Sequence, residues 1–188
     1  MKRAAIILTT SLILLSIPTI MPAQQDDQEV NWLSVEQAEK LASENPRPLF
    51  IDIYTDWCGW CRRMDSETLS HPAIAKILNE EFYPVKLNAE TNDEIKFQGQ
   101  TFINDGNNGR THQLAIAIGT VEGRIGYPTV AFFNEELQLL TAIPGFRTAR
   151  DMEPLLMFFA SESYKNISYE EFLETFEGTI TTEGQPVR

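Results

Sequence analysis

Short apolar runs, separated by turn-forming residues and by stripes with helical spacing, organise most of this chain. Residues 49–54, Leu-Phe-Ile-Asp-Ile-Tyr, are apolar on both faces, which predicts a central strand with Asp52 as its one misfit. Further strands are predicted over residues 82–87, 129–133 and 137–143. The last two should pair as a hairpin. Together they predict an α/β fold with a central mixed sheet flanked by helices.

Capping residues place helices around these strands. Ser34 and Gln37 have the spacing of a capping box, and the helix that they begin should end before Pro46. Ser168 and Glu171 repeat that spacing and predict an extra helix near the C-terminus. Its expected buried face consists of three residues, Phe172, Leu173 and Phe176. Apolar stripes predict further helices over residues 62–69, 73–78 and 151–160.

Between residues 89 and 124 the chain shows no regular spacing of apolar residues. This segment is polar and rich in turn-forming residues, and only residues 114–118 could form a short helix or strand. A connection of this length is uncommon unless it is functional or an insertion. The sequence leaves two placements open: a rim beside a functional site, or a remote surface excursion.

The first residues have the features of an export signal. Met1-Lys2-Arg3 precedes an apolar stretch that ends near Pro18, and cleavage is expected after Ala23. We therefore expect residues 1–23 to be a signal peptide and the mature protein to be periplasmic or secreted. Without cleavage, the same segment would anchor the protein to a membrane.

The remaining chain is long enough for a single domain with a real core, expected over residues 30–177, with a loose tail at 178–188. The net charge is −12, which argues against nucleic acid or an anionic membrane surface as a partner.

The only two cysteines of the chain sit three residues apart in Trp57-Cys58-Gly59-Trp60-Cys61, between the central strand and a helix. Such a pair is typical of a dithiol that opens and closes as one unit. The start of a helix stabilises an anion, so the Cys58 thiol should ionise below the usual pKa of about 8.5. We interpret Cys58 as a nucleophile and Cys61 as its resolving partner.

These residues resemble the exported thioredoxin-like proteins of the thiol-disulfide interchange type. Four separate features carry the resemblance: the motif at 57–61, Asp52 six residues before Cys58, Lys86 on the second strand, and Tyr127-Pro128 before the third. The resemblance covers roughly residues 30–160 and implies a thioredoxin-like fold. Relative to that fold, this chain has an insertion before the proline strand and an extra C-terminal helix.

The resemblance also implies roles for single residues. Asp52 and Lys86 would assist proton transfer at Cys61. Pro128 would be cis and face the disulfide, leaving the main chain of Tyr127 to pair with an extended substrate. The residues expected to contact substrate are Trp57, Gly59, Trp60, Tyr127 and Pro128.

The implied activity is protein-disulfide oxidoreduction on substrate proteins, together with a second redox partner. The cysteines carry the redox equivalents, so no cofactor or metal is expected. Trp60 places no cation between the cysteines, which favours a reductant over an oxidase. The charges of Arg62 and Arg63 partly offset this preference.

Other functions remain open at this point. Cys58, Cys61, His71 and His112 could form a zinc set on paper, but the histidines are isolated, and His112 is expected in a polar loop. A permanent structural disulfide is disfavoured because so small a ring removes little unfolded-state entropy. A non-catalytic binding or chaperone module, or an oxidase of protein thiols, is the alternative function.

Overall fold

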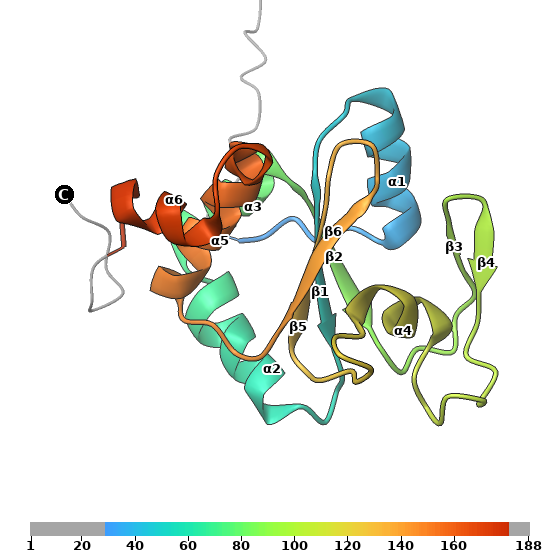
Figure 1. The fold of residues 1–188 in the computed structure, drawn as a ribbon. Coiled ribbons are helices and arrows are strands. Elements are labelled where there is room, and N and C mark those ends of the chain that lie inside the picture. The colour runs from blue at the N-terminus through green and yellow to red at the C-terminus, as the bar shows by residue number, and fades with distance from the viewer. Residues whose placement is uncertain (1–28, 181–188) are drawn as a thin grey trace, which may run out of the picture.

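A four-stranded mixed sheet forms the centre of the computed structural model, which describes residues 29–180 (Figure 1). Its order is β2-β1-β5-β6, and β1 runs parallel to β2 and antiparallel to β5. The central mixed sheet is thus confirmed. The strands are β1 (Leu49–Tyr54), β2 (Tyr83–Asn88), β5 (Thr129–Phe133) and β6 (Leu139–Pro144). The expected signal peptide and residues 181–188 lie outside the described residues.

Helices cover both faces of this sheet (Figure 1). On one face, α1 (Val35–Glu44) and α4 (Gln113–Gly119) enclose one apolar core. On the other face lie α2 (Gly59–Met64), α3 (Pro72–Glu81) and α5 (Ala149–Ala160), and α6 (Tyr169–Thr175) packs against α5. A single π-helical turn, Asp65–Leu69, extends α2. Within residues 29–180, no helix is both long and apolar enough to span a bilayer.

Side chains of β1 point alternately to the two faces of the sheet and so enter the two cores in turn. Leu49, Ile51 and Ile53 join the core beneath α1 and α4, whereas Phe50 joins the opposite core. Since successive strand residues point to opposite faces, Asp52 shares the face of Phe50, on the side of α2 and α3. A carboxyl group thus enters an apolar core.

Both predicted capping boxes are confirmed, at Ser34 with Gln37 and at Ser168 with Glu171. The predicted buried face of α6 is wrong. Leu173 is 44% exposed, and Phe172 and Phe176 are only partly buried. The physical reason is that α6 is an outer helix, which packs on α5 and not on the sheet.

Residues 179 and 180, expected in a loose tail, are held by α5. Glu153 lies buried inside that helix and accepts hydrogen bonds from the main-chain N–H groups of Thr179 and Ile180, at 2.7 and 3.1 Å. Ile180 is itself buried in the core beside α5. The tail prediction therefore does not hold for these two residues.

The connection between β2 and β5 contains a hairpin that the sequence did not predict. Strands β3 (Ile95–Phe97) and β4 (Gln100–Phe102) form a separate two-stranded sheet beside α1. Phe97 packs edge-on against Phe133 of the central sheet, with ring centroids 5.5 Å apart. The ambiguous run near residue 116 is helical, as α4.

Candidate functional site

The two cysteines lie where β1 ends and α2 begins. Cys58 is the N-cap of α2, and Cys61 stands in the first turn. They form a disulfide with the two Cα atoms 5.3 Å apart. The Sγ atom of Cys58 accepts a hydrogen bond from the main-chain N–H of Cys61, at 3.0 Å. The pair can therefore close within one helical turn, with a donor already directed at Cys58.

Exposed aromatic side chains flank the disulfide. Trp57 and Trp60 are 59% and 56% exposed, although both are large and apolar. Trp57 packs edge-on against Tyr127 at 5.9 Å, and Trp60 packs against Phe146 at 5.6 Å. The guanidinium of Arg63 lies over Trp60 and over Phe146, 5.3 and 5.0 Å from the ring centroids. Exposed apolar area of this kind is typical of a docking surface for another protein.

A larger side chain would fit at position 59, directly after Cys58. Gly59 is the first residue of α2, and a side chain there would meet only the tip of Arg62, 3.9 Å away. Arg62 instead donates a hydrogen bond to the main-chain oxygen of Asp56, at 2.7 Å.

The peptide bond between Tyr127 and Pro128 is cis, as the family resemblance implied. Thr129, the next residue, pairs with Ile53 at the end of β1. Pro128 therefore lies at the same end of the sheet as Cys58, which follows the end of β1. Within residues 29–180, no hydrogen bond engages the main chain of Tyr127. Its polar groups are available for pairing with an added strand.

A buried carboxyl and a lysine lie side by side on the neighbouring strands β1 and β2. Asp52 is 1% exposed and faces Lys86 across the ladder, with Nζ 2.8 Å from Oδ2. Its Oδ1 atom has no hydrogen-bond partner in the described part of the chain. Lys86 also pairs with Asp65, and its ammonium lies over the rings of Trp32 and Tyr54, 4.9 and 5.2 Å from their centroids.

Burial raises the pKa of Asp52 to about 6, because desolvation outweighs the attraction of Lys86. Desolvation alone would lower the pKa of Lys86, but its attraction to Asp52 and Asp65 raises it. A cleft of about 330 Å³ is lined in part by Lys86 and Asp65, so solvent reaches the lysine side of this ion pair. Asp52 can thus take up or release a proton near neutral pH, beside a lysine that stays charged.

Sequence reasoning missed Asp65. It follows α2 directly, four residues after Cys61, and one helical turn is the spacing that puts two side chains on the same face. The spacing from Cys61 could have pointed to Asp65. Its ion-pair partner, Lys86, lies 21 residues later in the sequence, so the pair itself gave no local signal.

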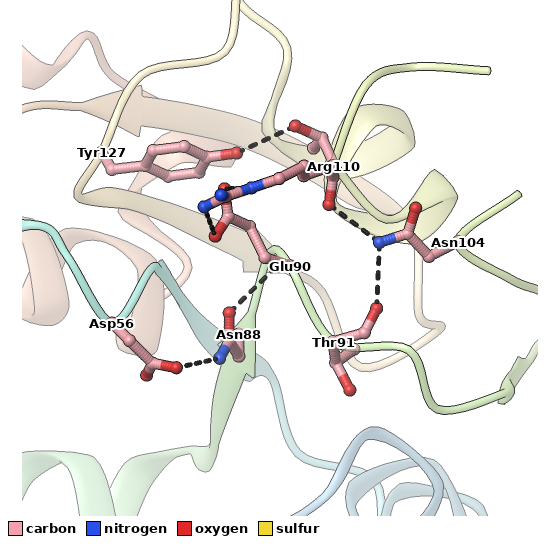
Figure 2. Close-up of polar contacts among 8 residues, drawn as sticks. Asp56, Asn88, Glu90, Thr91, Asn104, Arg110 and Tyr127 are labelled. Atoms are coloured by element: carbon pink, nitrogen blue, oxygen red, sulfur yellow. Dashed lines mark hydrogen bonds and ion pairs between the residues drawn. The ribbon is translucent and has the colours of Figure 1, made fainter. Parts of the chain in front are cut away.

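Figure 2 shows that residues of the inserted segment lie beside Tyr127, the residue against which Trp57 packs. Glu90, just after β2, receives two hydrogen bonds from the Arg110 guanidinium, at 3.2 and 2.7 Å. Arg110 and the N–H of the Trp57 side chain both lower the pKa of its carboxyl. The hydroxyls of Thr111 and Tyr127 are 3.5 Å apart. Of the two placements left open by the sequence, the rim beside the site is the observed one.

Both histidines of the chain cap helices. His71 precedes α3, and its Nδ1 accepts the N–H of Ala73 at 3.2 Å. His112 caps α4 through Leu114 N–H and is fully buried, with Nε2 3.1 Å from a main-chain oxygen. His112 does end the loop before α4, as expected, but its side chain is buried because it caps that helix. Across residues 29–180, no group of three or more His, Cys, Asp or Glu side chains could hold a metal.

A model of the thioredoxin-like DsbH family, described as a protein of unknown function, DUF255, matches residues 18–143. An uncharacterized protein of Caenorhabditis elegans is 29% identical over 73 residues, which are 38% of this chain and 10% of that protein. The thiol:disulfide interchange protein DsbD of Pasteurella multocida is 27% identical over 122 residues, 62% of this chain and 17% of DsbD. This chain thus spans a small part of these two curated relatives.

Among solved structures, one titled DsbH Oxidoreductase superposes with a TM-score of 0.52 at 13% identity, covering 81% of this chain and 95% of that structure. At that identity the likeness shows the fold alone. The fold is that of thioredoxin, as expected from the sequence.

Proposed function

Because this chain belongs to the thioredoxin-like DsbH family, we propose that it is a thiol-disulfide oxidoreductase acting on protein substrates through Cys58 and Cys61. The observation that carries the proposal is the disulfide at the start of α2, flanked by two exposed tryptophans. A disulfide with only a structural role would gain nothing from exposed aromatic neighbours. The relatives named as thiol:disulfide interchange proteins support the same chemistry.

In the reducing direction, the Cys58 thiolate attacks one sulfur of a substrate disulfide. A bond forms between the two sulfurs, and the second substrate sulfur leaves as a thiolate that takes up a proton. Cys61 then loses its proton and attacks the Sγ atom of Cys58. The internal disulfide forms, the substrate leaves with its second thiol, and two electrons have passed from the protein to the substrate.

Asp52 is the proposed acceptor of the Cys61 proton, through water. A carboxyl with a pKa of about 6 is ionised at neutral pH and still basic enough to accept that proton. Lys86 offsets the charge of the buried carboxylate, and Asp65 holds the ammonium from the solvent side. Run in reverse, the same steps would oxidise a dithiol.

We further propose that the protein acts as a reductant outside the cytoplasm. The uncharged Trp60 supports this direction, because it gives the Cys58 thiolate no extra stabilisation from a cation between the cysteines. The export signal expected at residues 1–23 supports the location. A reductant in that compartment needs a separate electron donor.

Equilibration of the purified protein with glutathione buffers tests this proposal. We expect a reduction potential closer to about −270 mV than to about −120 mV, and catalysed reduction of insulin by dithiothreitol. A potential near the higher value would indicate an oxidase. An absence of exchange with any disulfide would indicate a binding module instead.

The Cys58 thiol of the reduced protein is expected to titrate below the usual pKa of about 8.5, because the Cys61 N–H and the start of α2 stabilise its thiolate. The measurement is the rate of alkylation by iodoacetamide as a function of pH. The same titration in urea provides the reference for an unfolded chain. A folded midpoint equal to the reference would contradict the assignment of Cys58 as nucleophile.

A further inference from the structure

Trp57, the residue before the nucleophilic cysteine, is in contact with residues of the inserted segment. The Arg110 guanidinium and the N–H of the Trp57 side chain both lower the pKa of the Glu90 carboxyl. Arg110 binds that carboxylate through two nitrogens (Figure 2). The Glu90 side chain is partly buried, at 21% exposed, whereas Arg110 is 73% exposed. One carboxylate therefore joins the exposed tryptophan to a loop more than fifty residues away in sequence.

The loop itself is fastened at several points. The Asn104 amide donates to the main-chain oxygen of Arg110 at 2.8 Å and lies 3.3 Å from that of Thr91 (Figure 2). Thr111 reaches the hydroxyl of Tyr127, against which Trp57 packs. Trp57 and Tyr127 are thus each tied to the loop, at neighbouring residues 110 and 111.

A polar cleft of about 530 Å³ continues from this point. It is lined by Glu90, Asn92, Asn104, Asp105, Gly106, Gly109 and Arg110. Because Glu90 and Arg110 both line this cleft, a polypeptide that extended over Trp57 would continue into it. A small disulfide that contacts only the sulfurs does not extend so far.

We propose that Glu90 and Arg110 are positioning residues that fix Trp57 for polypeptide substrates, so that the inserted segment selects proteins over small disulfides. The inference rests on the proposed function and adds a substrate class to it. Neither residue touches the sulfurs, so their effect should lie in substrate binding.

Steady-state kinetics with insulin and with bis(2-hydroxyethyl) disulfide test the inference. Arg110→Ala and Glu90→Ala are expected to raise the KM for insulin about three- to fivefold, with a much smaller change in kcat and in the rate with the small disulfide. The double variant should match Glu90→Ala alone, because both changes break the same link. Arg110→Lys should restore part of the loss, since it keeps the charge but not the paired hydrogen bonds.

Arg124→Ala is the matched control. Arg124 is an exposed arginine of the same inserted segment, and its side chain makes no hydrogen bond or ion pair within the described range. Unchanged insulin kinetics in Arg110→Ala and Glu90→Ala would overturn the inference while leaving the proposed function intact. An equal fall with both substrates would also overturn it, because the link would then act on the dithiol. A wild-type protein that reduces neither compound would overturn the proposed function itself.

Discussion

Cys58→Ser is expected to reduce the catalysed reduction of insulin by at least about a thousandfold, to the rate of the uncatalysed reaction. Serine has nearly the same size but cannot form the sulfur–sulfur bond on which every later step depends. Cys61→Ser should give a different result. Its Cys58 can still attack, but no second thiol remains to release the substrate, so a mixed disulfide should accumulate.

Non-reducing gel electrophoresis distinguishes the two variants. Cys61→Ser should run as adducts that dithiothreitol removes, and Cys58→Ser, which retains one thiol, is the matched control and should form few. Both cysteines are almost fully buried, but Cys58 caps α2 and its Sγ atom accepts the Cys61 N–H, so Cys58 is the better nucleophile. Equal adduct formation by both variants would show that the order of nucleophile and resolving cysteine is wrong.

Asp52→Asn is expected to stabilise the oxidised protein far more at pH 8 than at pH 4. The pKa of Asp52 rises from 3.8 to about 6 on folding, because its carboxyl is buried. A carboxyl with a raised pKa destabilises the folded state once the pH exceeds the pKa that the group has in the unfolded chain. The full loss of folding free energy is present once the pH exceeds the pKa of the folded state. A shift of this size corresponds to about 3 kcal/mol, and asparagine carries no such cost.

The measurement is the free energy of unfolding in urea at several pH values, with the disulfide intact so that the thiols do not titrate. The difference between Asp52→Asn and the wild type should grow by about 2.5 kcal/mol between pH 4 and pH 8, because a small part of the cost is already present at pH 4. Any cost of burying the amide applies at every pH and cancels from this growth. Glu174→Gln, which removes an exposed carboxyl on α6 far from the Asp52 ion pair in sequence, is the control variant measured alongside it. A flat difference for Asp52→Asn would mean that the buried carboxyl titrates normally.

Local sequence signals predicted those elements that are strongly determined by their own residues. The run at 49–54 is apolar on both faces, and it is one of the two strands with neighbours on both sides. The serines at 34 and 168 cap helices because their side chains accept main-chain N–H groups three residues on, which is a local interaction. Cys58, Cys61 and Lys86 could be placed near one another only with the additional help of the family resemblance.

Features that depend on distant partners escaped sequence reasoning. Strands β3 and β4 have three residues each, too few to show an alternation, and they are held to α1 by Glu36 and Glu39, about sixty residues earlier. Asp65 resembles an ordinary surface acid until Lys86 is placed beside it. The link between Glu90 and Arg110 joins two charged residues in a polar stretch, where most charges face the solvent.

The hold of Glu153 on the residues after α6 bears on how this protein can be shortened. Both oxygens of that side chain are occupied by donors from beyond the last helix: the two main-chain N–H groups and the hydroxyl of Thr179. A truncation at residue 177, where the helical pattern ends, would leave an acid inside α5 without these donors and uncover the pocket that Ile180 fills. A minimal form for biochemical work should therefore extend through residue 180, with any affinity tag attached beyond it.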